Sequence, residues 1–359
     1  MVFRKRGIVR PNERFVYKGI VLDVVNDFNY LGTIFNYTGT FALNQEHLVG
    51  KALKSLNVLM ANCYKFDLKP NTICQLFDSF VGSVLSYGSE IWGFGKSKAI
   101  ERVHLKFCKR LLNVRQNSCN NAIYGELGRF PLFVMRYVNI VNYWLKIINS
   151  DNVIISKIYQ MSLGDCYRGK TNWVSCIKKL LCDYEFSNVF DNPNMYNSKW
   201  TSSIFKSVVI DNFKQIWFNE VSASSVLQLY KTVKDCIGFE TYLTILPKDL
   251  RFFVTRLRIS AHSLRIQTDR YCTTYTPRID RICKYCNKNE IEDEYHFVIN
   301  CERYTNIRTK YLNPFYYVRP SMFKFISLLK SDDEHILFNL SKYIKEATHI
   351  RLSYDYITN

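Results

Sequence analysis

Residues 45–63 read QEHLVGKALKSLNVLMANC, and this stretch indicates the fold class. Its apolar residues recur three and four positions apart, which is the spacing of one helix face. They are Leu48, Ala52, Leu56, Leu59, Met60 and Cys63. Pro70 ends the pattern, because proline lacks the N–H that a helix interior needs. The stretch therefore predicts a long amphipathic helix that buries this face against a core.

Similar helical patterns follow along most of the chain. Residues 71–85 repeat the spacing, with Asn71 as the expected N-cap. Residues 98–111 repeat it again, and Pro131 is well placed as the first residue of another helix. Residues 188–197 include a proline and predict a loop.

Four potential metal ligands are closely spaced near the C-terminus. They are Cys283, Cys286, His296 and Cys301, in the pattern C-x2-C-x9-H-x4-C. The C-x2-C turn brings two thiolates to one ion, and the histidine and last cysteine return on a short helix. Three thiolates and an imidazole suit Zn²⁺, and a filled tetrahedral shell predicts a structural zinc site without an open catalytic position.

One carboxylate of the acidic run at residues 290–294 is expected to orient His296. The alternative interpretation is an accidental spacing of reduced residues in a chain with 12 cysteines.

The first residues follow a different pattern from the helical stretches. Apolar and polar residues alternate on both sides of Asn26-Asp27, which predicts two short strands joined by a polar turn. The predicted fold class is therefore mainly α: a helical bundle with a short N-terminal β-hairpin and a small CCHC zinc knuckle near the C-terminus.

The charge of the chain indicates a polyanionic partner. Its 359 residues include 49 Lys and Arg against 31 Asp and Glu, a formal net charge of +18. Nucleic acid is the first expectation and an anionic membrane the second, with a basic but unspecialised protein as the plain alternative. No stretch approaches the roughly 20 apolar residues of a membrane span, and no signal peptide is evident. We therefore expect no membrane contact and an intracellular protein, in the nucleus or in a cytoplasmic ribonucleoprotein.

Basic residues concentrate in two places. Residues 248–288 form a basic arm before the knuckle, with aromatic residues such as Phe253 and Tyr275 interleaved. Arginine grips phosphate and aromatic rings stack on unpaired bases, so this mixture predicts contact with RNA or DNA. The second place is one face of the helix predicted at 98–111, where a solvated amphipathic helix is the alternative. The predicted contact residues are Arg256, Arg258, Arg265, Arg270 and Arg281 of the arm, and Lys106, Lys109 and Arg110 of the helix.

The search for catalytic residues finds no self-contained active site. Nucleotidyl transfer requires at least two carboxylates that converge on metal ions. The adjacent pair Asp332-Asp333 lies between two helical patterns, and its position predicts the N-cap of the last helix.

Several motifs, taken in order, resemble a known family. Phe28-Asn29-Tyr30-Leu31-Gly32 resembles the primer-grip hairpin that closes the palm of reverse transcriptases, which makes Tyr30, Leu31 and Gly32 primer-grip-like. The stretches YGSEIWG at 87–93, IERVHLKFCKR at 100–110 and YGELGRFP at 124–131 resemble the thumb and following region of LINE-type, non-LTR retrotransposon reverse transcriptases. Residues 257–271 and 281–308 are similar to the Cys/His segment of that family.

The resemblance implies a division of the chain and a role. The implied parts are a remnant palm hairpin (1–41), a thumb-like helical bundle (42–130), a helical connector (131–247), the basic arm with the CCHC knuckle (248–312) and a C-terminal helix (313–359). The family's metal-binding aspartates lie upstream of the primer grip, and only about thirty residues precede it here. The implied role is therefore binding of template–primer and element RNA by a C-terminal fragment, without polymerase activity of its own.

Two other interpretations stay open. The chain is a helical protein-interaction scaffold whose zinc knuckle is purely structural, or it is one half of an RNA-directed DNA polymerase that needs an upstream segment. Steep salt dependence of binding distinguishes a nucleic-acid-binding protein from the scaffold, and primer extension by the chain alone would show it to be an enzyme.

Overall fold

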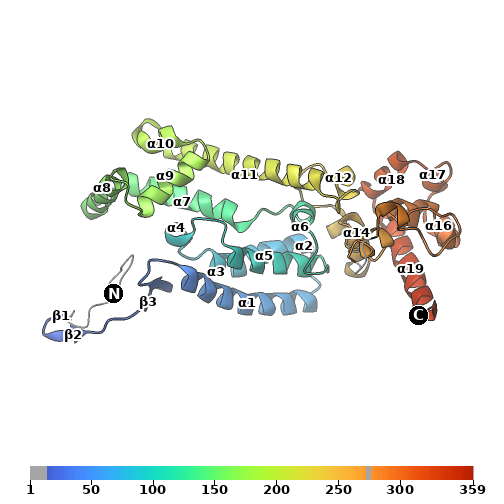
Figure 1. Ribbon diagram of the computed structural model, residues 1–359, viewed down its shortest axis with the longest axis horizontal. Helices are drawn as coiled ribbons and strands as arrows, with labels where there is room; N and C mark the ends of the chain where they lie inside the picture. The colour runs from blue at the N-terminus through green and yellow to red at the C-terminus, as the bar shows by residue number, and fades with distance from the viewer. Residues whose placement is uncertain (1–13, 272–275, 359) are drawn as a thin grey trace. The chain divides into compact units, whose positions relative to one another are not determined.

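The structure, a computed structural model, describes residues 14–271 and 276–358 (Figure 1). The start of the chain and Tyr275 of the basic arm lie outside the described residues. The described chain is mainly helical with short antiparallel strands near its N-terminal end, which confirms the predicted fold class. None of the described helices has both the length and the apolar character required to cross a membrane.

The described residues divide into two compact units. The first consists of the chain up to His104 and of Pro131–Asn212, and the second of Leu105–Phe130 and the chain from Phe213 onward. The helices α5 (Lys98–Leu111) and α11 (Ser198–Ala223) contribute residues to both units. The four potential metal ligands all belong to the second unit.

The first unit contains the strands and most of the longer helices. Its other elements are β1 (Phe15–Tyr17), β2 (Ile20–Leu22), β3 (Asp27–Tyr30), β4 (Thr33–Asn36), α1 (Ala42–Lys65), α2 (Pro70–Phe77), a π-helical turn (Asp78–Gly82), α3 (Ser83–Leu85), α4 (Ser89–Trp92), α7 (Leu132–Ile148), α8 (Val153–Tyr167), α9 (Trp173–Asp183), α10 (Ser187–Asp191) and a 3-10 turn (Pro193–Met195).

Two β-hairpins, rather than one, begin this unit. β1 pairs with β2 and β3 pairs with β4, so the predicted turn at Asn26-Asp27 is wrong. The second hairpin turns at Leu31-Gly32, whose φ angles of 49° and 83° are both left-handed. A two-residue type I′ turn requires this conformation at both positions, and glycine adopts it without strain. The glycine after Leu31 was the signal for the correct turn.

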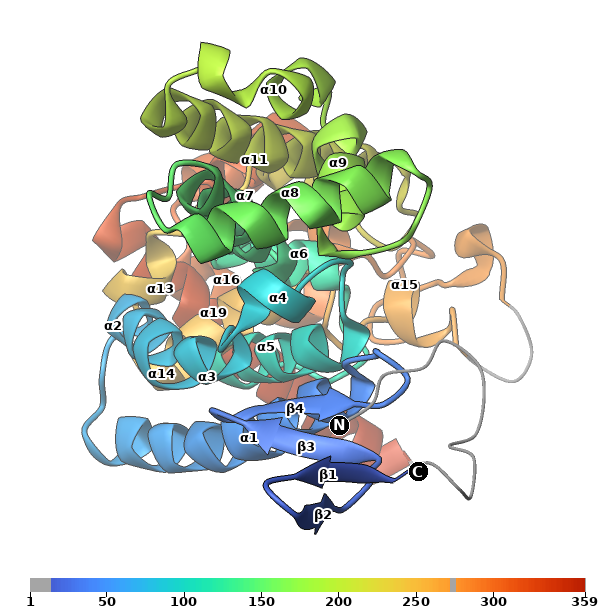
Figure 2. The ribbon, with the colours of Figure 1, turned by 90° about the vertical axis from the view of Figure 1, so that its left-hand side faces the viewer.

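The helix α1 buries the face that the sequence predicted. Leu48, Ala52, Leu56, Leu59, Met60 and Cys63 are all buried. β4 packs beside this helix (Figure 2), and the backbone N–H of Ile34 donates to the buried Asn44 Oδ1 at 3.0 Å. The hairpin is thus fixed to α1 by a polar contact as well as by packing.

Several helix ends differ from the prediction by one residue or more. Lys69, not Asn71, is the N-cap of α2, because proline is favoured as the first helical residue and Pro70 takes that place. Pro131 is the N-cap of α7 rather than its first residue. The stretch predicted as a loop at 188–197 contains most of α10 and the 3-10 turn that follows it.

The second unit contains several short helices, the long helix α19 (Glu334–Thr358) and the metal-ligand residues. Its other elements are α6 (Asn120–Glu126), α12 (Tyr230–Val233), α13 (Tyr242–Ile245), α14 (Lys248–Arg258), α15 (Arg265–Thr268), a 3-10 turn (Arg278–Asp280), a π-helical turn (His296–Asn300), a 3-10 turn (Glu302–Tyr304), α16 (Thr305–Tyr311), α17 (Pro314–Tyr317) and α18 (Met322–Leu329). Asp333 Oδ1 accepts from Ile336 N at 2.9 Å, which confirms the predicted cap of the last helix.

A buried ion network joins α6, α13 and α14 within this unit. Arg258 Nη2 lies 3.2 Å from Glu126 Oε1 and 2.6 Å from Glu240 Oε2. Tyr242 Oη donates to Glu126 Oε2 at 2.6 Å, and Lys234 pairs with Glu240. Burial raises the pKa of the Glu126 carboxyl, and the Arg258 guanidinium opposes that rise. The network satisfies charges that would otherwise be costly to bury.

Candidate metal centre

Cys283, Cys286, His296 and Cys301 lie together, as the sequence predicted. Their ligand atoms are all within 4.8 Å of one another. The Sγ atoms of Cys283 and Cys301 are 3.9 Å apart, and Cys286 Sγ is 3.4 Å from His296 Nε2. Within the described parts of the chain, no other group of three or more His, Cys, Asp or Glu residues is arranged to hold a metal ion.

The spacing of these atoms fits one tetrahedral ion. Metal–sulfur bonds of about 2.3 Å and a metal–nitrogen bond of about 2.0 Å give tetrahedral edges of about 3.8 Å between sulfurs and about 3.5 Å between sulfur and nitrogen. The two distances above agree with these edges to within a few tenths of an ångström. The sulfur–sulfur distance is about twice that of a disulfide, so the pair is not oxidised.

A tight backbone turn presents the first two cysteines. Ile282 and Ile291 form an antiparallel bridge across the turn, and Cys283 N donates to Glu290 O at 2.9 Å. Tyr285 N donates to Cys283 Sγ at 3.4 Å, which favours a thiolate there. The two cysteine side chains therefore face the same side of the turn.

His296 begins a single π-helical turn, His296–Asn300, and Cys301 directly follows it. Asp293 Oδ1 accepts from His296 N at 2.9 Å and starts the turn. Cys301 N donates to His296 O at 2.8 Å and closes it. The predicted short helix is thus present, and its wider π spacing brings the second pair of side chains back toward the first.

The cluster favours a thiolate at Cys283. Hydrogen bonds from Cys301 and then His296 outweigh the effect of burial and lower the pKa of the Cys283 thiol to about 4. The same hydrogen bond raises the pKa of Cys301, because that thiol donates its proton to Cys283. A cation placed among these sulfurs would meet negative charge that the fold already favours.

A carboxylate of the acidic run orients the histidine, as predicted. Glu290 Oε2 lies 2.8 Å from His296 Nδ1, so the ring presents Nε2 to the cysteines. The His296 contact also lowers the pKa of the Glu290 carboxyl.

We expect Glu290→Ala to weaken metal binding by about tenfold to 100-fold, because partners of this kind fix the tautomer and direction of a ligating ring. Competition with a chromophoric chelator measures the affinity. The control is Glu302→Ala, an exposed glutamate beside Cys301, which should bind metal like the unaltered chain. Equal affinities of the two variants would contradict the orienting role of Glu290.

A second carboxylate, Glu292, ties the centre to α19. Its side chain is 1% exposed, accepts from Arg265 N at 2.9 Å and pairs with Arg351. The Arg351 guanidinium also lies over the Tyr285 ring, 4.4 Å from its centroid. The turn that carries the first two cysteines is therefore attached to the last helix.

The second pair of ligands is attached to the same part of the fold. Arg308 Nε donates to Val298 O at 2.9 Å, and its Nη2 donates to Cys301 O at 2.7 Å. Tyr343 Oη donates to Phe297 O at 2.8 Å. The metal centre is thus connected to α16 and α19. Its four ligands therefore support these two helices as well as the knuckle itself.

Two of the arginines that were predicted to contact nucleic acid, Arg258 and Arg281, are buried and bond within the protein. The Arg258 side chain is 1% exposed in the buried ion network, and Arg281 is 3% exposed. Arg281 donates to the backbone oxygens of Ile266 and Thr276 at 2.9 to 3.0 Å. These two guanidinium groups have little exposed surface to offer a phosphate. The basic pattern of this arm therefore reflects its internal polar contacts as well as its surface.

Arg265 and Arg270 are half-buried and also bond within the unit. Arg265 pairs with Asp269 at 2.6 Å and donates to Ile282 O at 2.7 Å. Arg270 donates to Ser225 Oγ at 3.1 Å. Arg256, another of the five predicted arginines, lines a cavity in the second unit.

The three predicted residues of α5 differ in exposure. Lys106 is exposed and Arg110 half-buried, whereas Lys109 is 5% exposed and donates from Nζ to Gln116 O at 2.7 Å. Burial lowers the pKa of Lys109. Lys109 therefore holds the loop after α5 and is not a surface cation.

The primer-grip-like residues form the tip of the second hairpin. The side chains of Tyr30 and Leu31 are 59% and 75% exposed. Tyr87 Oη donates to Leu31 O at 2.6 Å, and the Tyr87 ring lies against Gly32. The tip is thus fixed to the first unit while its side chains face outward.

Sequence reasoning missed the residues that support the centre. Arg351 and Tyr343 lie about fifty residues from the ligands, and Glu126 lies more than a hundred residues from Arg258. No local spacing links such pairs.

No protein-family model, curated protein or solved structure matches the chain. The resemblance to LINE-type reverse transcriptases therefore depends on the sequence motifs alone.

Proposed function

We propose that the chain is a nucleic-acid-binding protein whose second unit is stabilised by one structural zinc ion. The observation that carries the proposal is the group of four convergent ligands in a strongly basic chain. Four protein ligands fill a tetrahedral shell and leave no position for a substrate, so the ion serves the fold. The proposed activity is therefore binding through the surface that the metal stabilises.

Zinc is the metal that the ligand set favours. Three soft thiolates and one imidazole suit zinc better than hard cations, which take oxygen ligands. The 3.9 Å and 3.4 Å distances support a tetrahedral ion of that size. One zinc per chain is the expected content.

The proposed partner is RNA or DNA. The net charge of +18 favours a polyanion. Lys284 and Lys288 are exposed on the turn that carries the first two cysteines, and Lys106 is exposed on α5. The sequence motifs add a resemblance to the C-terminal part of a LINE-type reverse transcriptase, in which this segment would grip template–primer or element RNA. A nuclear or ribonucleoprotein location would follow from that role.

Salt dependence tests the proposal. The chain should bind a labelled single-stranded oligonucleotide at low salt. The logarithm of its association constant should then fall with the logarithm of salt concentration, with a slope of about −0.7 for each phosphate contacted. Fluorescence anisotropy at several salt concentrations measures the slope. No binding at low salt, or binding that salt does not change, would contradict the proposal.

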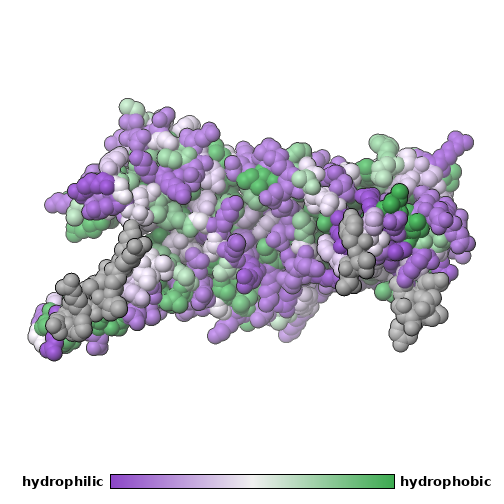
Figure 3. All heavy atoms as spheres, in the orientation of Figure 1, coloured by the Kyte–Doolittle hydropathy of each residue, from purple (hydrophilic) through white to green (hydrophobic). Residues whose placement is uncertain are grey.

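One feature of the first unit favours a protein-interaction scaffold as a second candidate. α8 buries none of its residues, and four apolar side chains on it are 59% to 73% exposed. They are Val153, Ile154, Ile158 and Met161. Apolar residues reach the surface over this helix in Figure 3. The double variant Ile154→Asp, Ile158→Asp tests this candidate. If it abolished binding of a protein partner but left oligonucleotide binding unchanged, the scaffold would be the better description.

A further inference from the structure

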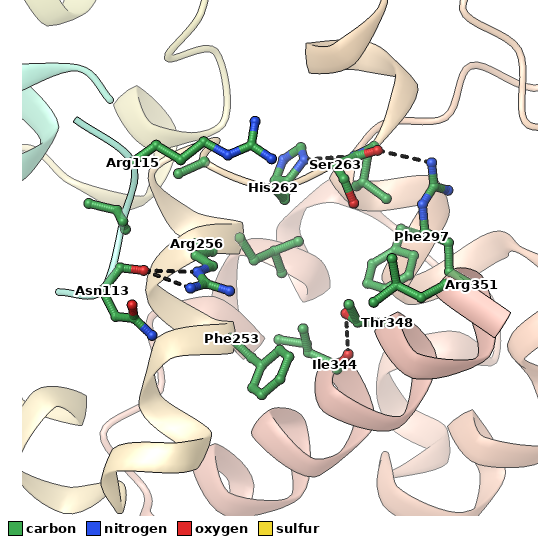
Figure 4. A pocket seen from close by; sticks show the side chains of 15 residues that line it. Asn113, Arg115, Phe253, Arg256, His262, Ser263, Phe297, Ile344, Thr348 and Arg351 are labelled. Atoms are coloured by element: carbon green, nitrogen blue, oxygen red, sulfur yellow. Dashed lines mark hydrogen bonds between the residues drawn. The ribbon is translucent and has the colours of Figure 1, made fainter. Parts of the chain in front are cut away.

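A cavity of about 500 Å³ lies within the second unit, beside the metal centre. Its walls come from the loop after α5, from α14 and the residues after it, and from α19 (Figure 4). The volume lies in the range of small-ligand sites, about 300 to 1,000 Å³. Arg115, Arg256, His262 and Arg351 line it, and none of its lining residues in the described chain is acidic.

The end of α5 explains how Arg115 reaches the cavity. Asn113 has φ of 52°, and the N–H groups of Asn113 and Val114 donate back to Arg110 O and Lys109 O. This pattern is a Schellman motif, in which asparagine is accepted at the left-handed position. It ends the helix and starts a loop that carries Arg115.

Two side chains then fix this loop. Arg256 of α14 donates from Nε and Nη2 to Asn113 O at 3.0 and 2.8 Å. Lys109 Nζ donates to Gln116 O at 2.7 Å. Arg115 therefore lies between two anchored residues, and Figure 4 shows its side chain extending toward His262 at the rim.

In the part of the chain that the structure describes, the charges around the cavity do not balance. Arg351 pairs with Glu292, and His262 Nε2 lies 2.8 Å from Glu294 Oε1. Arg115 and Arg256 have no carboxylate partner among the described residues, and Arg256 bonds only to a neutral backbone oxygen. Burial and the nearby Arg115 both lower the pKa of Arg256. Two neighbouring guanidinium groups without counter-charge favour an anion between them, and phosphate suits them best.

The opposite side of the cavity is apolar. Phe253 of α14 and Ile344 and Leu352 of α19 line it, and Leu352 is 54% exposed. Figure 4 places Phe253 and Ile344 on the side away from Arg115. An aromatic ring in the same cavity as two arginines offers a base a stacking surface while its phosphate lies against the guanidinium groups.

We propose that this cavity binds one nucleotide unit, with its phosphate between Arg115 and Arg256 and its base against Phe253. Two sources of this nucleotide unit fit the site. The first is an unpaired nucleotide of a bound strand, and for this source the inference rests on the proposed function. The other source is a free nucleoside monophosphate, which has the same chemistry.

Two binding measurements on the full zinc-loaded chain test the site. The first is the affinity for a labelled single-stranded oligonucleotide, and the second is thermal stabilisation by adenosine monophosphate. Arg115→Ala is the test variant, because Arg115 is exposed and its side chain bonds to none of the residues that the structure describes. Arg319→Ala is the matched control, an exposed arginine of the same unit that does not line the cavity. Loss of one charged contact should weaken binding about tenfold in Arg115→Ala and much less in the control.

Photocrosslinking distinguishes the sources. A strand carrying 4-thiouridine should crosslink at Phe253 if the strand enters the cavity. In a second outcome the chain binds no strand but is stabilised by the monophosphate, and the stabilisation is lost in Arg115→Ala. That result would support the site with a free nucleotide as its ligand and would contradict the proposed function. A different result would overturn the cavity site and leave the proposed function intact. In that case Arg115→Ala and Arg319→Ala would weaken strand binding equally, the monophosphate would not stabilise the chain, and the crosslinks would lie outside the cavity.

Discussion

Cys283→Ser is expected to abolish zinc binding and unfold residues 280–312. A structural zinc ion contributes about 10 to 16 kcal/mol on binding, which is comparable to the roughly 5 to 15 kcal/mol that holds a whole domain folded. One ion bound by the four ligands would join the turn that carries Cys283 and Cys286 to the turn that carries His296 and Cys301. Elemental analysis should give about one zinc for the unaltered chain and none for the variant, and hydrogen exchange should accelerate across the segment.

The structure extends this expectation beyond the knuckle. Arg308 and Tyr343 donate to backbone oxygens between the second pair of ligands, and Arg351 pairs with Glu292. Exchange should therefore also accelerate in α16 and in α19 near Tyr343. Cys236→Ser is the control, since Cys236 is exposed in the same unit and outside the cluster. A Cys283→Ser chain that kept one zinc, or kept its exchange protection without metal, would contradict the structural role.

Arg258→Met should destabilise the second unit by about 3 to 5 kcal/mol. The substitution leaves the Glu126 carboxylate buried with its Tyr242 hydrogen bond but without a cation. Removing one partner of a buried ion pair lowers the free energy of unfolding by about this amount, because the remaining charge stays buried without compensation. Hydrogen exchange of the amides in α6 and α14 measures the free energy of opening.

A second substitution separates the charge from the packing. Glu126→Gln added to Arg258→Met removes the unpaired charge and should recover part of the loss. Arg319→Met, on the surface of the same unit, should change stability by no more than about 0.5 kcal/mol. If Arg258→Met and Arg319→Met were equally stable, Arg258 would not hold the unit together.

The elements that depend on local periodicity were predictable from the sequence. The face of α1 is buried at each predicted position. The four ligands, their short helical turn and the carboxylate on His296 follow the spacing C-x2-C-x9-H-x4-C. Ligand spacing constrains the chain strongly because one small ion must meet all four atoms.

The surface charge was harder to predict. Arg258, Arg281 and Lys109 looked like surface cations, but each is buried against oxygens of other residues. The partner of Arg258 lies far along the chain, whereas Arg281 and Lys109 donate to backbone oxygens that are much nearer in sequence. A sequence pattern gives the type of a side chain but does not say whether it faces solvent or an oxygen of the folded chain. For the same reason Arg115, the exposed arginine beside the cavity, was not among the predicted contacts.

The most direct test is oligonucleotide binding by the full chain with one zinc bound, after chelation of the zinc and after its return. A structural zinc ion in a nucleic-acid-binding chain predicts salt-sensitive binding to a single strand, its loss when the metal is removed, and its recovery when zinc is restored. Binding that is unchanged by removal of the metal, or no binding to the zinc-loaded chain at low salt, would contradict it.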